Sequence, residues 1–240
     1  MDNYSRSYDY QTGNTTDLAG AFSKLMRSVY VWLCAALAIT ALTAMNVASN
    51  SELVMAIASN KLYFWGLMIA EIGLVIYLSA RIMKMSFLTA ALSFAAYSIL
   101  NGVTMSFIFF AYTMASIAQT FFITAGTFGA MAVVGFFIKK DLSTVGRALI
   151  MLLIGIIIAT VVNIFLHSSG LALILNYLGV LVFTGLTAYD SQKIKEMMLV
   201  ASEQGVTDET QKLALLGSLS LYLDFINLFL YLLRIFGDRK

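Results

Sequence analysis

The stretch LYLDFINLFLYLLRIFG, residues 221–237, places a carboxylate in the middle of an apolar segment that is long enough to cross a lipid bilayer. A charged side chain at bilayer depth costs between ~3 and ~17 kcal/mol, and such residues usually mark a functional site. Asp224 is that carboxylate, and Asn227 follows three residues later on the same face of a helix. Both side chains should point into a bundle of helices or into water, which predicts that the other spans surround this helix.

The composition is that of a polytopic membrane protein. Of the 240 residues, 60% are hydrophobic and 12% are charged, whereas a soluble domain has about 45–50% apolar and about 25% charged residues. The net charge of +2 comes without a basic tract, so we expect no nucleic-acid binding. The single Cys34 and the single His167 have no partners for a disulfide or a fixed metal site, and no cofactor is expected.

Seven apolar runs, each near the ~20 residues that a spanning helix needs, predict an all-α fold with seven transmembrane helices. The runs cover about residues 28–48, 62–80, 86–111, 117–138, 148–166, 171–190 and 213–236. Residues 1–20 are polar and have no cleavage-site pattern, so we interpret them as a disordered, cytoplasmic tail and not as a signal peptide. Residues 21–240 are then a single transmembrane domain, and the absence of proline favours continuous helices.

Lysine and arginine in the links predict the orientation of the spans. With the N-terminus in the cytoplasm, the cytoplasmic segments carry 3, 2, 3 and 3 of these residues in chain order, and the other segments carry 1, 0, 0 and 3. The last segment departs from the rule, because Arg234, Arg239 and Lys240 fall outside. The seventh run either crosses the membrane fully or re-enters it, and its length favours a full crossing.

Four ionisable residues lie within or at the ends of spans: Glu71, Arg81, Asp190 and Asp224. Arg81 and Asp190 fall at the same, cytoplasmic end of the bundle, where the last helix begins. At about 1.5 Å per residue, Asp224 lies roughly 16 Å along that helix from residue 213. Asp190 and Asp224 therefore meet if the sixth helix continues past Asp190, and Arg81 can pair with either of them.

Two carboxylates that share a site away from water cannot both ionise cheaply, so one holds a proton and the pair titrates as a unit. With Arg81 added, the pair becomes a candidate lock, in which ionised carboxylates hold the arginine and protonation releases it. Ordinary interpretations stay open beside this one. Asp190 can be a solvated residue at a helix end, and Arg81 can be an ordinary positively charged residue that flanks a span. Glu71 can be a protonated, hydrogen-bonded group within the bundle.

A fixed calcium site is not expected from these residues. Calcium takes 6–8 oxygen ligands, and Asp190, Asp224, Asn227 and Glu71 cannot supply a full shell. Any calcium contact near Asp190 and Asp224 is therefore partial, hydrated and transient, which suits passage better than storage.

Three motifs resemble the bacterial branch of the Bax inhibitor-1 family, also called the transmembrane Bax-inhibitor-motif family. They are GLTAYDSQKIK at residues 185–195, the stretch at 221–237 quoted above, and FGAMAVVGFF at 128–137 followed by KKDLS. The resemblance extends from about residue 20 to the C-terminus. It implies a seven-helix fold with the last helix near the centre and six helices around it.

The resemblance also implies a function. It implies a pH-sensitive calcium leak governed by two aspartates on the sixth and seventh helices, which match Asp190 and Asp224. It implies an arginine after the second span that bonds an aspartate in the closed state, for which Arg81 is the best match. Glu71 matches an acidic position of the family in the second span. Some bacterial members are linked to the membrane protease FtsH as modulators, so FtsH is a candidate partner beside calcium, protons and the lipid bilayer.

Three functions compete for a pair of intramembrane aspartates. The first is a calcium leak channel of the bacterial inner membrane, with Glu71 and Asn227 along the ion pathway. The second is a non-conducting adaptor that modulates a membrane protease or a stress response. The third, an intramembrane aspartyl protease, is disfavoured: the residues before Asp224 are LYL, where presenilin-like enzymes have Gly-x-Gly, and a chain without proline lacks their Pro-Ala-Leu motif. We therefore expect no enzymatic activity.

Overall fold

The computed structural model describes residues 3–240, with side chains from Asp17 onwards. In chain order, the helices are α1 (Asn3–Ser49), α2 (Ser51–Ser59), α3 (Lys61–Arg81), the 3-10 helix η1 (Ile82–Lys84), α4 (Phe87–Met105), α5 (Ile108–Ala111), α6 (Met114–Phe137), α7 (Ser143–Leu166), α8 (Ser169–Ser202) and α9 (Asp208–Phe236). Seven helical segments within the described residues are long and apolar enough to cross a membrane, which confirms the predicted all-α fold. The described β-structure is limited to one isolated bridge, between Tyr112 and Arg239.

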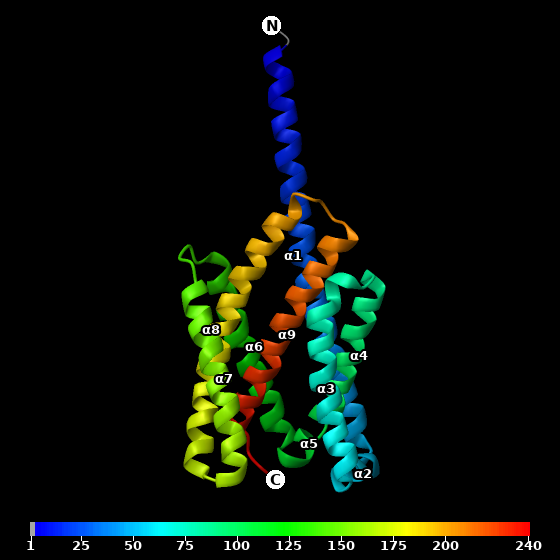
Figure 1. Ribbon diagram of the computed structural model, residues 1–240, viewed down its shortest axis with the longest axis vertical. Coiled ribbons are helices and arrows are strands. Elements are labelled where there is room, and N and C mark those ends of the chain that lie inside the picture. Colours follow the sequence, from blue (N-terminus) through cyan, green and yellow to red (C-terminus); the bar gives the residue numbers. More distant parts are fainter. Residues whose placement is uncertain (1–2) are drawn as a thin grey trace.

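The N-terminal part of α1 differs from the prediction. A disordered tail is predicted over residues 1–20, but the helix of the first span continues back to Asn3 (Figure 1). Residues 1–2 lie outside the described part of the chain. No proline interrupts this segment, and extending an existing helix costs far less than nucleating a new one, so a long span can continue into a polar sequence.

α9 lies at the centre of the bundle, with the other spans around it (Figure 1). In its most apolar segment 67% of the residues are buried, compared with 6% in α3 and in α7. It packs directly against α1, α4, α6 and α8, while α3 packs on α4 and α7 packs on α8. The prediction of a central last helix is confirmed. The surround has two layers, because α3 and α7 lie outside the helices that cover α9.

α9 runs the whole length of the bundle and does not turn back (Figure 1). It starts at what we call the basic end, which contains the links 82–86, 138–142 and 203–207 with Lys84, Lys139 and Lys140. It finishes at the opposite end, here called the α5 end. There the backbone N–H of Thr113 donates to the carbonyl oxygen of Asp238 at 3.1 Å, and the N–H of Lys240 donates to that of Ala111 at 3.1 Å.

Basic residues at the C-terminal end of the chain have local partners: Arg234 in the last turn of α9, and Lys240 after it. The Arg234 guanidinium lies over the ring of Tyr231, 5.4 Å from its centroid. The Lys240 ammonium donates to the carbonyl oxygen of Phe109 at 2.8 Å. These contacts accommodate two of the positive charges at the α5 end, which depart from the positive-inside pattern.

Two glycines bring neighbouring helices close to α8. A Cβ atom at Gly135 of α6 would collide with the carbonyl oxygen of Ala188, and one at Gly146 of α7 would collide with the ring of Tyr189. Small residues of this kind allow helix backbones to approach closely within a membrane. Because these contacts fix residues 188 and 189 from two sides, they also position Asp190, which follows directly.

Two polar side chains of α8 form hydrogen bonds with the backbone at the end of α6 and in the link between α6 and α7. Gln192 donates from Nε2 to the carbonyl oxygen of Lys140 at 2.9 Å, and its Oε1 accepts from the N–H of Leu142 at 2.8 Å. The Lys195 ammonium donates to the carbonyl oxygen of Phe136 at 2.8 Å. That carbonyl is one of those that the end of a helix leaves without an intrahelical partner, so Lys195 acts as a C-terminal cap of α6.

Candidate functional site

Asp224 lies in the middle of the most buried helix. Its side chain is 4% exposed, and its Oδ2 atom is buried without a hydrogen-bond partner. Leaving a buried polar group unpaired costs about 1–3 kcal/mol, and more for a charged one. Unsatisfied buried atoms in native proteins call for an explanation, such as a catalytic role or an ion or water that binds there. Asp224 is therefore the strongest functional candidate in the bundle.

Aromatic contacts on both sides of α9 determine which way Asp224 faces. The hydroxyl of Tyr222 lies 2.7 Å from that of Thr40 on α1. The ring of Phe225 packs edge-on against Phe121 of α6, with 5.6 Å between the centroids. Since successive residues of a helix are 100° apart, fixing these two side chains also fixes the direction of Asp224, which directly precedes Phe225.

Asp224 faces α8. Gly217 lies seven residues before Asp224, so both are on the same face of α9, and Gly217 packs against Ile194 of α8. Counting along the two antiparallel helices from this contact places Asp190 opposite residue 221. Asp190 is then within one helical turn of Asp224, or roughly 5 Å along the axis. The two carboxylates are close enough for their charges to repel each other.

The surroundings of Asp190 are more polar than those of Asp224. Asp190 is half-buried, and the charge of Lys193 acts on it from the next turn of α8. The Lys193 ammonium also lies over the ring of Tyr189, 5.9 Å from the centroid. The hydroxyl of Ser191 is buried and, among the described residues, has no partner. The structure thus brings together the two aspartates predicted from the sequence, one of them fully buried and one near the basic end.

Arg81 is separate from this pair in the structure. It is the last residue of α3 and is exposed, and the buried Oδ2 of Asp224 has no partner. The link that follows is held by Lys212 of α9, whose ammonium donates to the carbonyl oxygens of Met83 and Met85 at 3.2 Å each. The predicted arginine lock is therefore not formed in this conformation.

Glu71 occupies a second polar site, on the other side of α9. Its carboxylate accepts hydrogen bonds from the amide of Asn101 and, at 2.8 Å, from the hydroxyl of Thr104, both on α4. A cavity of about 240 Å³ beside it is also lined by Asn227. The amide of Asn227 donates to the carbonyl oxygen of Leu223 at 2.8 Å, one turn earlier.

The structure therefore divides the residues that were predicted to share one face. Asp224 faces α8, whereas Asn227 lies in the cavity with Glu71 between α3, α4 and α9. Residues three apart on a helix differ in direction by about 60°, and in a crowded bundle that is enough to place them between different neighbours. Glu71 and Asn227 form one polar site, and Asp190 and Asp224 form another.

Several polar residues around these sites were assigned no role from the sequence: Thr40, Asn101, Thr104 and Tyr222. In the sequence, each of them is a polar side chain inside an apolar run. Burying such a side chain costs free energy unless it has a hydrogen-bond partner. The sequence marks such positions but does not show their partners, because these lie on other helices. Within residues 17–240, no three His, Cys, Asp or Glu side chains cluster closely enough to hold a metal ion.

Comparison with known proteins places the whole bundle in one group. The family described as inhibitor of apoptosis-promoting Bax1 matches residues 22–240. The chain is 48% identical over 218 residues to the inner membrane protein YbhL of Escherichia coli, with 90% of this chain and 92% of the relative covered.

Other bacterial relatives align over similar lengths. A protein of Borreliella burgdorferi is 44% identical, with 91% of this chain and 93% of the relative covered. A protein of Rickettsia prowazekii is 37% identical over all 240 residues, with 100% of both chains covered. The similarity thus includes α8 and α9 and both polar sites.

Proposed function

Because the chain belongs to the Bax inhibitor-1 family, we propose that it is a pH-sensitive calcium leak channel, gated by protonation of Asp190 and Asp224. It is an integral membrane protein with seven apolar helices, and its Escherichia coli relative is named as an inner membrane protein. The proposal places this chain in the inner membrane as well, with the N-terminus and the basic end on the cytoplasmic side, in agreement with the lysine and arginine distribution.

The unpartnered Oδ2 of Asp224 is the observation that carries the proposal. A carboxylate kept at this depth, with a second carboxylate about one turn away, needs a proton or a cation between the two groups. Either one relieves the repulsion, so protons and cations compete for the same place. Competition of this kind makes the occupancy of the site depend on pH.

Calcium fits the site as a transient occupant. Two aspartates supply only part of its coordination shell of 6–8 oxygens, and water must supply the rest. A partial shell binds the ion weakly enough for it to leave again, which conduction requires. Glu71 and Asn227 provide a second polar site along the other side of α9 and are the proposed continuation of the pathway.

Arg81 enters the proposal through movement of α3. This helix is little buried and packs mainly on α4, so it can shift at modest cost without disturbing the core around α9. A shift toward α8 brings Arg81 within reach of the aspartates when they are ionised. Protonation of the pair then weakens its hold on the arginine, as well as its affinity for calcium.

The proposal is tested by calcium flux into liposomes that contain the purified chain, measured from acidic to alkaline pH. Asp190→Asn and Asp224→Asn should each change the pH dependence, because each removes one titrating group. Glu203→Gln is the matched control, since Glu203 lies exposed in the link between α8 and α9. Arg81→Ala should raise the flux at alkaline pH, where the lock is expected to hold.

The outcomes separate the proposed functions. If both Asp→Asn variants show the same flux and pH dependence as the unmodified protein, the channel is retained and the gating mechanism is overturned. No flux above empty liposomes, with protein that elutes as a single folded species, would overturn the channel. That result would favour a non-conducting adaptor, tested by co-purification with a membrane protease such as FtsH. The proposal gives the aspartates a binding and gating role and assigns no enzymatic activity.

A further inference from the structure

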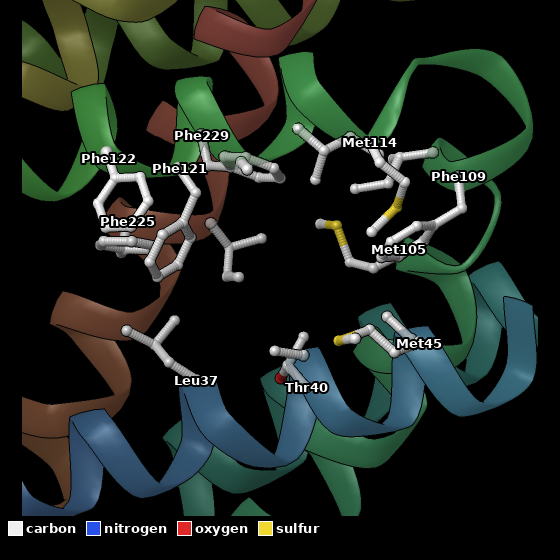
Figure 2. Close-up of a pocket in the computed structure, with 16 residues that line it drawn as sticks. Leu37, Thr40, Met45, Met105, Phe109, Met114, Phe121, Phe122, Phe225 and Phe229 are labelled. Carbon is white, nitrogen blue, oxygen red and sulfur yellow. The ribbon is translucent and has the colours of Figure 1, made fainter.

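An apolar trough runs along the bundle between α1 and α6. Its part near the α5 end is a cavity of about 290 Å³, and its part near the basic end has a volume of about 780 Å³. Leu37, Phe121 and Phe225 line both, so the two cavities adjoin each other along the trough. Figure 2 shows the first part, with Leu37 of α1 pointing across the space toward Phe121 and Phe225, and with Met45 of α1 on the side of Met105 and Phe109.

The trough is open sideways, toward the surroundings of the bundle. Phe121, Phe122 and Val133 lie along its α6 side and are exposed. Phe225 of α9 forms part of its floor, and at the basic end Phe22 of α1 approaches Phe136 of α6, with 6.5 Å between the ring centroids. In a bilayer this opening meets hydrocarbon, and apolar walls do not hold ordered water.

A polar pocket adjoins the trough at the basic end. It has a volume of about 600 Å³ and shares Phe22, Phe136 and Phe137 with the trough. Four charged side chains line it: Lys139, Lys195, Asp141 and Glu196. An apolar surface therefore adjoins a charged pocket, as the acyl chains of a lipid adjoin its head group.

With Lys140, which follows Lys139, the basic side chains around this pocket outnumber the acidic ones, Asp141 and the exposed Glu196. The carboxylate of Asp141 accepts from the N–H of Ser143 at 2.8 Å at the start of α7, and hydrogen bonds from Ser143 lower the pKa of Asp141. Its negative charge is therefore directed at the N-terminus of that helix. Lys195 is bonded to a neutral carbonyl, and the side chains of Lys139 and Lys140 are exposed.

An arginine on α1 adds to this positive surface. Arg27 is exposed and lies four residues after Ser23 and seven before Cys34, which both line the trough. It is therefore on the face of α1 that borders the trough. Long basic side chains at this depth can extend along the helix toward the interface, and Phe22, which lines the polar pocket, lies five residues before Arg27 in that direction.

We propose that the trough binds one acyl chain of an anionic phospholipid, with the phosphate at Lys139, Lys140 and Arg27. The apolar walls match the chain, and the basic residues match the negative head group. At the basic end the trough narrows where Phe22 and Phe136 pack together, and both residues also line the polar pocket, so the apolar walls and the basic residues meet at this point.

A glycine in the trough allows a direct test. Gly129 lines the trough, and a Cβ placed there has nothing within 4 Å, so Gly129→Trp fills the space without a backbone collision. Gly126 of the same helix also has nothing within 4 Å and lines neither part of the trough, so Gly126→Trp is the matched control. Equal thermal unfolding midpoints of the two variants establish that both are folded.

The probe is a phosphatidylglycerol with a photoactivatable diazirine on one acyl chain, compared with a phosphatidylcholine that carries the same chains. The full-length protein is reconstituted in vesicles with each lipid, irradiated, and analysed by mass spectrometry of its peptides. Phosphatidylglycerol should label residues 30–37 and 121–133 more strongly than phosphatidylcholine does. Gly129→Trp should remove most of this labelling, and Gly126→Trp should leave it unchanged.

Variants of the basic residues test the head-group site without touching the trough. A basic residue near the membrane surface changes the binding of an anionic lipid by about fivefold, so Lys139→Gln with Lys140→Gln should reduce the preference for phosphatidylglycerol by about 25-fold or to the level of phosphatidylcholine. Equal labelling by both lipids in the unmodified protein would overturn the proposal. So would labelling of α1 and α6 that persists in Gly129→Trp.

Discussion

The hydroxyl of Tyr222 donates a hydrogen bond to the hydroxyl of Thr40, at 2.7 Å, between residues that are 182 positions apart in the chain. The direction follows from the next bond, because Thr40 uses its own proton to donate to the carbonyl oxygen of Ser98 at 3.0 Å. This short chain of hydrogen bonds joins α9 to α1 and α4. Thr40 and Tyr222 are both buried, so neither has water as an alternative partner.

We expect substitution of Tyr222 to lower the stability of the protein less than substitution of Thr40 does. Tyr222→Phe removes one donor and leaves Thr40 bonded to Ser98, so stability should fall by about 0.5–1.5 kcal/mol. Thr40→Val leaves both the Tyr222 hydroxyl and the Ser98 carbonyl without this partner, and should cost about 1–3 kcal/mol. Thermal or denaturant unfolding of the purified chain measures both changes.

The double variant provides the control. Because the interaction is lost in either single variant, Thr40→Val with Tyr222→Phe should cost less than the sum of the two single changes. Strictly additive costs would show that the two hydroxyls are not coupled.

Gly135 and Gly129 should respond in opposite directions to the same substitution. Gly135→Ala drives a methyl group into the backbone of α8 at Ala188, and overpacking of this kind typically costs about 1–3 kcal/mol. Gly129→Ala meets open space within the same helix and should stabilise it by roughly 0.5–1 kcal/mol. Unfolding midpoints of the two variants, measured side by side in one detergent, check the prediction. A neutral Gly135→Ala would contradict the close approach of α6 to α8.

Lys212 should control the link between α3 and α4. Lys212→Met removes two hydrogen bonds, to the carbonyl oxygens of Met83 and Met85, while keeping an apolar side chain of similar length. Hydrogen exchange of the amides in residues 82–86 should become faster, with little change in the rest of the bundle. Lys84→Met, at an exposed position, is the control and should leave the exchange unchanged.

Glu71 and Asp224 should affect flux in different ways. Glu71→Gln retains a polar side chain of the same size but removes a charge from the proposed pathway, so flux should fall across the whole pH range. Asp224→Asn should flatten the pH dependence, because it removes a group of the titrating pair. Flux measurements at several pH values separate the two patterns. A flattened profile in Glu71→Gln would move the proton-sensitive element from α8 and α9 to α3.

The architecture follows from the sequence to a large extent. Seven runs of spanning length, and a carboxylate that cannot face lipid, are enough to predict the helices and to place the last one in the centre. The boundaries are less accurate. The break predicted over residues 49–61 contains α2, which the side chain of Asn50 caps, and the run predicted over 86–111 is divided into α4 and α5.

The sites depend on a property that a single sequence does not contain, the register between helices. The meeting of Asp190 and Asp224 follows from helix length, because both lie a known distance from the same end of the bundle. Helix length does not show whether a given polar residue faces α4 or α8. The pairing of Glu71 with Asn101, and the separation of Asn227 from Asp224, become visible only when the helices are packed.

The central position of α9 has a consequence for biogenesis. The six surrounding spans all precede it in the chain, so each of them is synthesised before the segment that fills their interior. Until then Thr40 on α1 lacks the hydroxyl of Tyr222, and the face of α8 that packs on Gly217 has no partner. Helical hairpins can form early, but the mature bundle closes only after translation of α9.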